Sequence, residues 1–535
     1  MLEQLADRVS PRTLALALAA LYLVYALATR INEAARVRAL GGRAPVRTTY
    51  LPLGLDLVYK AVKATLRNAS YDFWLDNFRI AGKDENPYTV EAGVGGMRTI
   101  FTADPDNIKA ILATQFADYG KGERFNREWH EFLGDSIFTT DGTKWHGSRQ
   151  LIRPQFIKDR LSDIAVFERH IGVLLKHLGG NGETVDIMDL FFRYTLDAAT
   201  DFLLGRSVES LDNPSAEFAE AFAHVQHVQG LIAKIGYASS RSEIVEHMTD
   251  FCSPMNWVLP RKEFRQNLRK MNQFIEPFID QALSLSPEEL EKRTKNEEGY
   301  TFLHALASYT RDRAVLRDQL AAVLLAGRDT TACTLSWLFY ELSNHPRVVQ
   351  KLREEILAVV GNDAMPTYEH LKSMKYLQHT INEVLRLYPV VPFNIRFALR
   401  DTTLPRGGGP DGNSPIGVLK DTPIGYSTLV MQRRADIYPP VSESFPPVLS
   451  FAPERWDSWT PKTWTYIPFN GGPRICIGQQ FALTEMAYTV VRLLQRFERV
   501  ENRTNGRHPG LKSDIVLQPA RETFVAFYAA PLAEK

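Results

Sequence analysis

A loop of ten residues towards the C-terminus, Phe469 to Gly478, has the residue types of a metal-binding loop. Cys476 can supply a thiolate, a strong electron donor when it is the axial ligand of a metal ion. Gly472 and Gly478 remove side chains where backbone must pass close to a bound group and where N–H groups can point at the sulfur. Arg474 lies two residues before the cysteine, where its guanidinium can clamp a carboxylate.

The order of these residues resembles the cysteine loop of the cytochrome P450 superfamily, F-x-x-G-x-R-x-C-x-G, at all five fixed positions. The resemblance implies that the cofactor is haem b and that Cys476 is the axial ligand of its iron. It also implies that Arg474 and Phe469 contact the haem. Free cysteines are more often ordinary small buried side chains, but the complete match makes that alternative remote here.

A second group of polar side chains interrupts the apolar run Leu320–Leu325, which predicts a buried helix. Asp329 and Thr330 are costly there unless a partner or a water satisfies each of them. An acid beside a hydroxyl can relay the protons that dioxygen reduction consumes, and Thr330 can bend the helix to make room for dioxygen. A helix cap or a solvated turn is the alternative. Residues 326–331 resemble the family's A/G-G-x-D/E-T motif, which implies that Asp329 and Thr330 are catalytic.

A third pattern can position the cysteine loop. Glu383 and Arg386 are three residues apart, so they share one face of a predicted helix and can form an ion pair. An E-x-x-R pair alone occurs by chance in almost any protein, but here Arg455 follows in a P-E-R-W segment. In the resembled family these residues form a buried ion network. We therefore expect Glu383, Arg386 and Arg455 to be structural, and the loss of one partner to be severe.

A fourth pattern, W-x-x-x-R, places Trp145 and Arg149 four residues apart on one helix face. By resemblance both donate hydrogen bonds to haem propionates. Arg396, after the turn at 389–392, is a further candidate for the same role. Ordinary core packing is the alternative for Trp145, since tryptophan often simply fills space.

The elements that must position these residues are predicted to be mostly helical. The expected fold class is mainly α: by resemblance, the cytochrome P450 fold, a helical bundle around haem with small β-sheets, plus an N-terminal transmembrane helix. Helical patterns cover residues 344–361, 371–388 and 478–496, and strand-like stretches cover 91–101, 394–404 and 524–529. The glycine-rich segment 405–415 lacks a following Lys-Ser/Thr, so it predicts a hairpin loop rather than a phosphate cradle.

Composition excludes several classes of protein. The formal net charge of +1 gives no indication of nucleic-acid binding. The three cysteines, which contain no C-x-x-C pair, argue against a disulfide framework and a zinc site. A free thiol ligand suits the reducing cytosol.

The N-terminus carries an uncharged, largely apolar run, Thr13–Thr29, of 17 residues. As a helix it would span about 25 Å, close to the thickness of the endoplasmic reticulum membrane. A cleaved signal peptide and a buried core helix are the alternatives, and the small residues 26–28 resemble a cleavage site. Positive charge gathers on the C-terminal side of the run, which favours an uncleaved single-pass anchor in that membrane with a cytosolic catalytic domain. The expected organisation is an anchor at 1–30, a basic hinge at 31–47 and a catalytic domain at 48–535.

The resemblance implies an enzyme that inserts one oxygen atom from O2 into a C–H bond of a lipophilic substrate. The strings 404–412 and 469–482 resemble the fungal branch of alkane and fatty-acid hydroxylases, which implies oxidation of long chains at or near the terminal carbon. Only 59 residues follow Cys476 in a chain of 535, too few for a flavin domain, so we expect a separate NADPH-dependent flavoprotein reductase. Two alternatives stay open: tailoring oxidation of a polyketide or terpenoid, and a non-catalytic haem protein that binds a ligand. The Asp329–Thr330 pair argues against the second.

By the same resemblance the substrate pocket should draw on five segments: Phe116–Phe138, Ala221–Gly236, Leu320–Thr330, Val391–Ile395 and Ile515–Gln518. Terminal attack needs a narrow pocket that admits only the end of the chain. We expect Phe393 and Ile395 to form one wall of that constriction, with Leu324 and Leu325 opposite.

Overall fold

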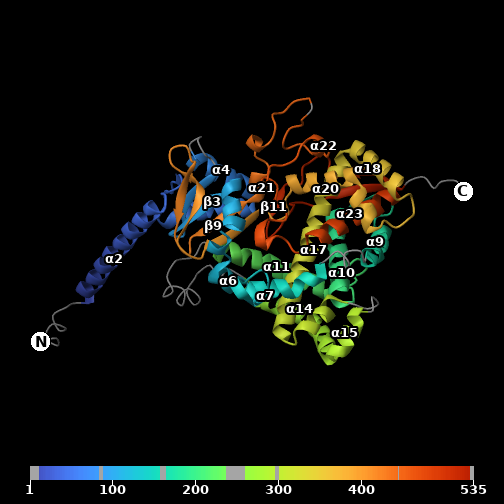
Figure 1. Ribbon diagram of the computed structural model, residues 1–535, viewed down its shortest axis with the longest axis horizontal. Helices are drawn as coiled ribbons and strands as arrows, with labels where there is room; N and C mark the ends of the chain where they lie inside the picture. The colour runs from blue at the N-terminus through green and yellow to red at the C-terminus, as the bar shows by residue number, and fades with distance from the viewer. Residues whose placement is uncertain are drawn as a thin grey trace.

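The computed structural model describes residues 11–82, 88–156, 164–236, 260–295, 301–443 and 445–529. They form a long N-terminal helix and a mainly helical body, and the largest sheet lies at the end of the body from which that helix projects (Figure 1). This confirms the predicted fold class. One of the three cysteines, Cys252, lies outside the described residues.

The body is built around α17 (Arg313–Asn344), a helix of 32 residues that is buried on nearly every side. Asp312 caps its N-terminus by accepting hydrogen bonds from the N–H groups of Ala314 and Val315. One cluster of buried apolar side chains surrounds its C-terminal half and a second surrounds its N-terminal half. A helix that is buried all round is a core helix, so α17 is the element against which the others are placed.

The other helices of the described body, in chain order, are α3 (Leu55–Leu66), α4 (Ser70–Gly82), α5 (Pro105–Lys109), α6 (Gly122–Leu133), α7 (Gly142–Ile152), α9 (Ala165–His177), α10 (Ile187–Leu204), α11 (Glu217–Gly236), α14 (Arg261–Ser284), α15 (Pro287–Lys295), α16 (Phe302–Tyr309), α18 (Pro346–Val359), α19 (Tyr368–Ser373), α20 (Lys375–Leu387), α21 (Thr428–Met431), α22 (Arg455–Ser458) and α23 (Gln479–Arg496). Helices α10 and α23 pack against α17, which brings the segment after the cysteine loop beside the segment of Asp329.

The largest sheet has six strands in the order β1-β2-β3-β9-β6-β4. Its strands are β1 (Val46–Arg47), β2 (Thr89–Val94), β3 (Met97–Thr102), β4 (Tyr119–Gly120), β6 (Phe393–Ala398) and β9 (Pro423–Ser427). Three small sheets contain β5 (Asn181–Asp186), β10 (Phe497–Asn502) and β13 (Phe524–Ala529); β7 (Thr402–Gly408) and β8 (Ser414–Val418); and β11 (Leu511–Ser513) and β12 (Leu517–Pro519). The glycine-rich segment connects β7 to β8, so the predicted hairpin is confirmed.

Most of the predicted elements are present, and three differ in extent. The helix expected over 371–388 is two helices, because Met374 has extended backbone angles between α19 and α20. The strand expected over 91–101 is the β2–β3 hairpin, whose turn contains two glycines with positive φ, Gly95 and Gly96. The strand expected over 394–404 is divided between β6 and β7, which lie in different sheets.

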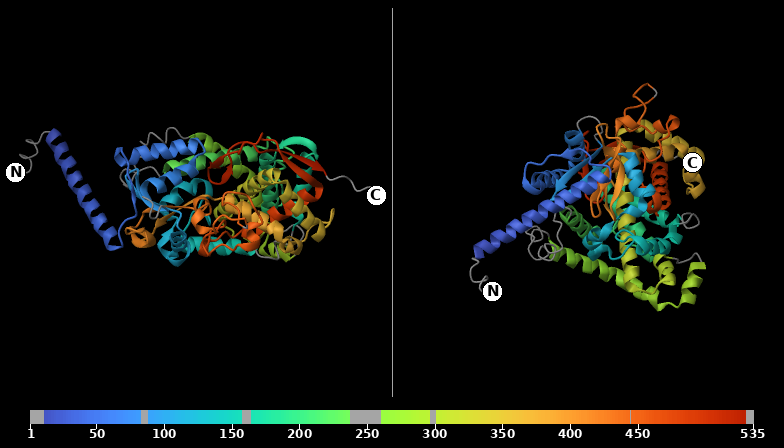
Figure 2. Two further views of the ribbon diagram at one scale, coloured as in Figure 1. Left: turned by 90° about the horizontal axis from the view of Figure 1, so that it is seen from above. Right: turned by 60° about the vertical axis from the view of Figure 1, so that its left-hand side comes forward.

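The N-terminal helix α2 (Pro11–Ala39) is long and apolar enough to cross a membrane, and its most apolar part is not buried (Figures 1 and 2). It continues to Ala39, so the first half of the expected hinge is helical. Nothing in residues 31–39 breaks a helix, and the chain turns only at Gly41 and Gly42, which have positive φ. The end of α2 also contacts the body, through an Arg36–Asp401 ion pair of 2.5 Å and a Gly417 N–H that donates to Gly42. The first part of the expected hinge is therefore helical, and the part after it is hydrogen-bonded to the body.

Candidate active site

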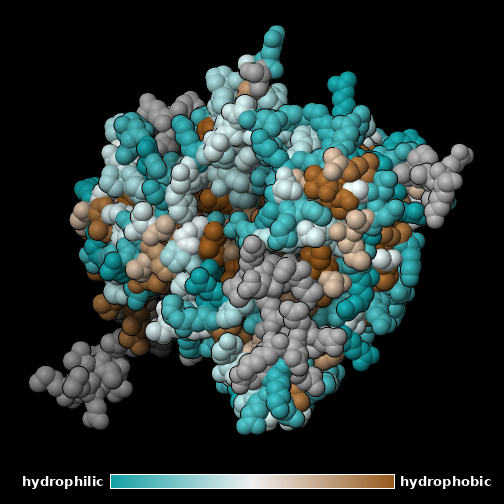
Figure 3. All heavy atoms as spheres, turned by 45° about the vertical axis from the view of Figure 1, so that its right-hand side comes forward, coloured by the Kyte–Doolittle hydropathy of each residue, from teal (hydrophilic) through white to brown (hydrophobic). Residues whose placement is uncertain are grey.

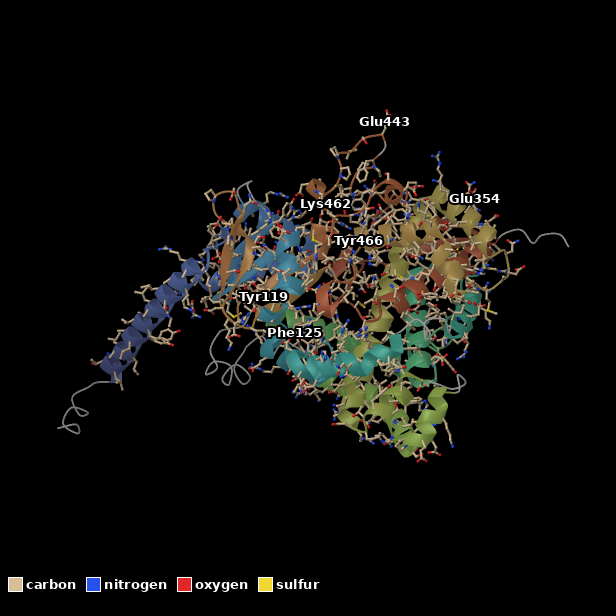
Figure 4. All side chains as sticks on the ribbon, in the orientation of Figure 1. Tyr119, Phe125, Glu354, Glu443, Lys462 and Tyr466 are labelled. Atoms are coloured by element: carbon tan, nitrogen blue, oxygen red, sulfur yellow. The ribbon has the colours of Figure 1, made fainter. Side chains whose placement is uncertain are left out.

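A cavity of about 860 Å³ lies within the body and is lined mainly by apolar side chains. They come from α3, α4, α6, α10, α11, α17, β3, β6, the cysteine loop and α23, and Phe125 of α6, labelled in Figure 4, is one of them. The outer face of the body in Figure 3 is instead mostly hydrophilic, with apolar side chains in separate patches. The cavity can therefore enclose a large apolar compound.

The cysteine loop presents Cys476 to this cavity just before α23 begins. The Cys476 N–H donates to the Phe469 carbonyl at 3.0 Å, and the Gly478 N–H donates to the sulfur. Gly472 has a φ of +68°, and a Cβ there would lie 1.9 Å from the carbonyl oxygen of Leu112, so only glycine fits. Burial raises the pKa of the Cys476 thiol, so a thiolate at this position needs a positive partner such as a metal ion.

Five cationic side chains line the same cavity, namely Lys121, Arg124, Arg149, Arg396 and Arg474. Arg474 donates to the Asp141 carboxylate at 2.5 Å and lies with its guanidinium carbon 4.6 Å from the centre of the Trp145 ring. Its Nε is buried and finds no hydrogen-bond partner among the described residues. Arg149 donates to the Ile475 carbonyl at 3.0 Å, so α7 is tied to the cysteine loop. The structure therefore brings Trp145, Arg149, Arg396 and Arg474 together at one wall of the cavity.

The cations of this cavity wall have too few anionic partners among the described residues to balance their charge. Burial, together with Arg396 and Arg474, holds the pKa of Lys121 well below its ordinary value. Burial also lowers the pKa of Arg474 to about 10, and Arg396 and Arg149 add to that effect against the opposing pull of Asp141. Cations held this close together need anions opposite them. A haem carries two carboxylates, which these cations could bind, and an iron, which Cys476 could bind. The residues present therefore fit haem.

On α17 the two predicted catalytic residues face different surroundings. Thr330 lines the cavity, and its hydroxyl donates to the Ala326 carbonyl at 2.7 Å. Helix α17 is not interrupted at this point, so the local opening expected at Thr330 is absent from the described structure. Asp329 is buried in mid-helix, which excludes the cap and turn alternatives, and it is absent from the lining of the cavity. Burial raises the pKa of its carboxyl, and Arg328 and the Gln226 amide oppose that effect.

A second acid of the site was not found from the sequence. Glu485 of α23 lines the cavity, is buried and shares a hydrogen bond with the Thr331 hydroxyl. Burial raises the pKa of its carboxyl to about 8, so the side chain carries a proton at neutral pH. An acid nine residues after Cys476, within an otherwise apolar helix face, was the feature of the sequence that could have revealed it. Lys121 was also missed, because a single lysine has no motif.

The lining contains residues from each of the five segments expected to form the pocket. It also contains segments that were not expected, above all α3, α4 and the β2–β3 hairpin. Phe393 and Ile395 line the cavity, and Phe393 stacks on Trp74 with ring centres 5.0 Å apart. Leu325 lines the cavity too, but Leu324 is buried in the core and does not. The expected constriction therefore includes one of the two leucines.

The Glu383, Arg386 and Arg455 side chains meet in the interior, and each is essentially inaccessible to solvent. Glu383 accepts two hydrogen bonds of 2.8 Å from Arg386 and one of 3.3 Å from Arg455. The Ala452 N–H and the Trp456 indole each donate to it at 3.0 Å. The network joins α20 to the segment that precedes the cysteine loop. None of its three residues lines the cavity, which fits a structural role.

The described part of the chain contains no cluster of three or more His, Cys, Asp or Glu side chains that could hold a metal ion, so Cys476 is the candidate ligand of a prosthetic group. A mainly helical body that encloses such a cysteine beside a cationic wall is the form of a haem-thiolate protein. The model of the family "Cytochrome P450" matches residues 87–527. The chain therefore belongs to the cytochrome P450 family, and it is a monooxygenase of that family.

The chain is also similar to individual members of the family. The chain is 48% identical to the cytochrome P450 monooxygenase pvhE of Talaromyces variabilis, over 98% of this chain and 96% of that protein. It is 43% identical to cytochrome P450 52A1 of Candida tropicalis, over 85% and 82% of the two chains. It is 41% identical to cytochrome P450 52A13 of Debaryomyces hansenii, over 86% of each. Membership of the family implies a haem cofactor, O2, a lipophilic substrate and a reductase that supplies electrons.

Proposed function

We propose that this monooxygenase hydroxylates long-chain fatty acids or n-alkanes at or near the terminal carbon. The observation that carries the proposal is the cavity, which is lined by apolar side chains all the way from Leu57 and Val62 of α3 to Ile477 beside the cysteine. A long hydrocarbon chain has no polar group to match along its length, and such a lining suits it. The strings 404–412 and 469–482, which resemble the fungal branch of alkane and fatty-acid hydroxylases, support this substrate class.

The outer end of the cavity supports uptake from a lipid phase. Val62 and Leu66 line the cavity and yet are 41% and 74% exposed, so the cavity opens to the surface along α3. Further apolar side chains, among them Leu55 and Tyr59, are more than half exposed on the same helix. Large exposed apolar patches mark interaction sites. We place this mouth against the endoplasmic reticulum membrane, with α2 as an uncleaved single-pass anchor and the body on the cytosolic side.

Terminal oxidation requires a restraint on the chain. Primary C–H bonds are stronger than the neighbouring methylene bonds, so an unrestrained oxidant attacks inside the chain. Phe393 and Ile395 on β6 and Leu325 on α17 all line the cavity, and the Trp74 ring stacks on Phe393. These side chains narrow the approach so that only the chain end reaches the reacting position.

The cofactor that we assign is haem b, which supplies an iron for the activation of dioxygen when it is bound. Cys476 would bind its iron, and Lys121, Trp145, Arg149, Arg396 and Arg474 would hold its two propionates. Thr330 holds a proton at its hydroxyl on the cavity side of α17, and Asp329 replenishes that proton. Glu485 keeps its own proton at neutral pH and hydrogen-bonds Thr331, which holds α23 against α17. The electrons come from a separate NADPH-dependent flavoprotein reductase.

The test uses the purified chain with haem and such a reductase, and a panel of saturated fatty acids and n-alkanes of increasing length. We expect NADPH consumption to rise with chain length and the products to carry oxygen on the terminal carbon or its neighbour. The absence of turnover with every member of the panel would overturn the proposed substrate class. Conversion of these substrates mainly at mid-chain carbons would overturn the proposed constriction.

Tailoring oxidation of a polyketide or terpenoid is the second candidate. The chain is more similar to the Talaromyces monooxygenase, at 48% over 98% of its length, than to the 52A proteins, so kinship with the 52A proteins does not by itself select linear chains. The same panel, extended by cyclic terpenes and aromatic polyketides, separates the two candidates. Conversion of a ring compound with no conversion of linear chains would establish the second.

A further inference from the structure

The Asp329 carboxylate is held by contacts that leave it outside the cavity. Its Oδ2 accepts a hydrogen bond of 2.5 Å from the Gln226 amide of α11, and its Oδ1 lies 3.3 Å from Arg328. The Oδ1 atom is buried and finds no hydrogen-bond partner among the described residues. Thr330, by contrast, lines the cavity. A proton on Asp329 therefore has no direct access to the cavity while these contacts last.

The Gln226 amide also bonds Arg328 through its oxygen. Arg328 donates to the Gln226 Oε1 at 3.0 Å, so one glutamine bridges both charged residues of α17. The Arg328 guanidinium also lies over the Phe192 and Phe222 rings, at 5.2 Å and 5.3 Å, and this packing fixes its direction. Gln226, Arg328 and Asp329 are all less than a tenth exposed, so little water competes with these contacts.

Helix α11 also forms part of the substrate cavity. Gly230, Leu231 and Ala233 line it. Gln226 and Gly230 are four residues apart, so they lie on the same face of the helix. A molecule that fills the cavity presses on the helix one turn beyond the glutamine, and a small displacement there is enough to break a hydrogen bond.

We propose that Gln226 is a positioning residue that keeps Asp329 clamped until a substrate in the cavity displaces α11, so that protons are delivered only when substrate is present. The inference rests on the proposed role of Asp329 as a proton donor. It gives the amide a regulatory purpose, because dioxygen reduced without substrate consumes NADPH and releases peroxide or water. The clamp consists of two hydrogen bonds of Gln226, one donated to the Asp329 carboxylate and one accepted from the Arg328 guanidinium. Loss of these bonds should lower the fraction of molecules in which Asp329 is clamped by about tenfold.

The test compares variants of the haem-loaded protein with its reductase in the absence of any substrate. Gln226→Leu removes both contacts, and Gln226→Glu keeps the length and the acceptor for Arg328 but loses the donor to Asp329. We expect NADPH consumption without substrate to rise about tenfold in both variants. Gln229→Leu is the matched control: Gln229 lies on the same helix and is buried, but its amide donates to the Glu128 carbonyl of α6. We expect its rate to equal that of the wild type.

A spectroscopic measurement tests the clamp without turnover. Infrared difference spectra with and without dodecanoic acid should contain a carboxyl band that Asp329→Asn removes. In Gln226→Leu the Asp329 band should already be at its substrate-bound position before dodecanoic acid is added. A Gln226→Leu or Gln226→Glu rate within twofold of the wild type overturns the proposal, as does an equal rise in Gln229→Leu.

Asp329→Asn distinguishes this proposal from the one on which it rests. If Asp329→Asn keeps the full yield of product per NADPH, the proton-donor role itself is overturned. If it loses that yield while Gln226→Leu behaves as the wild type, the clamp alone is overturned.

Discussion

Two buried carboxylates in this protein have opposite surroundings. Glu383 receives hydrogen bonds at both oxygens, from two guanidinium groups, an indole and a backbone N–H. Asp329 has one hydrogen bond at Oδ2 and none at Oδ1 among the described residues. A buried carboxylate that is satisfied at every atom is fixed in place, whereas one that is half satisfied can leave its partners at small cost. The difference separates a residue that holds the fold from one that is placed to react.

Glu485 extends this comparison to the other side of the cavity. It is as buried as Asp329, but it lines the cavity and stays protonated at neutral pH. A neutral carboxyl needs fewer partners than a carboxylate, so the Thr331 hydroxyl is sufficient. The protein therefore uses three buried acids in three ways: Glu383 paired with arginines, Glu485 neutral, and Asp329 clamped by an amide.

The largest effect is expected at Glu383. Glu383→Ala leaves Arg386 and Arg455 buried and uncompensated, which should lower the free energy of unfolding by about 3–5 kcal/mol and reduce the yields of haem and soluble protein. Glu354→Ala is the control, because Glu354 is exposed on α18 and is labelled in Figure 4. Chemical denaturation monitored by circular dichroism measures the difference. Equal stability of the two variants would show that the network is not structural.

The next effect concerns Thr330, which lines the cavity. Thr330→Ala should keep haem and substrate binding but lower the product formed per NADPH by about tenfold, because Thr330 directs protons to the position where they lead to product. Without its hydroxyl, the electrons and protons that are still supplied leave as peroxide. Thr334→Ala is a matched control: that hydroxyl makes the same kind of bond, to the Thr330 carbonyl, and lies away from the cavity lining. Equal product yields for Thr330→Ala and the wild type would refute the relay.

A smaller effect is expected from the raised pKa of Glu485. Its carboxyl holds a proton up to a pH of about 8 in the folded state, but only to about 4.5 when unfolded. The free energy of unfolding should therefore fall as pH rises between these values, by at most about 1.4 kcal/mol per unit. Glu485→Gln cannot titrate, so it should match the wild type near pH 4 and be more stable at pH 8. Thermal unfolding at the two pH values measures this, and parallel pH profiles for both proteins would contradict it.

The smallest effect is a change of product. Phe393→Ala should move oxidation of a long-chain fatty acid inward by one or more carbons and lower the yield per NADPH, because the chain end is less restrained. Leu324→Ala is the control, since Leu324 is buried but does not line the cavity. It should lower stability and leave the product profile unchanged. Gas chromatography of the hydroxylated acids gives the profile, and an unchanged profile for Phe393→Ala would remove this wall from the account.

The sequence was sufficient for residues that act through local patterns. The cysteine loop, the W-x-x-x-R pair and the E-x-x-R pair each have a fixed spacing, and the structure brings their members to the cavity wall or to one buried network. The helices around them were predicted because their apolar residues recur at helical spacing. Their ends were less certain: the break at Met374 follows from backbone angles that no residue type there dictates.

Three features required the structure because the parts that they bring together are distant in the chain. Gln226 lies 103 residues from Asp329, and an isolated glutamine carries no pattern. Lys121 faces Arg396 and Arg474 only because β4 and β6 are neighbouring strands. The contribution of α3 to the cavity follows from its packing against α4 and β2, which sequence periodicity does not specify.

The assignment of Cys476 as the haem ligand underlies every functional statement, and one spectrum tests it most directly. The reduced protein is exposed to carbon monoxide, and its absorption is compared for the wild type, Cys476→Ala and Cys333→Ala. Cys333 is a buried cysteine of α17 and serves as the control. We expect the long-wavelength Soret band of a thiolate-ligated carbonyl complex in the wild type and in Cys333→Ala, and its loss in Cys476→Ala. Persistence of that band in Cys476→Ala would contradict the account.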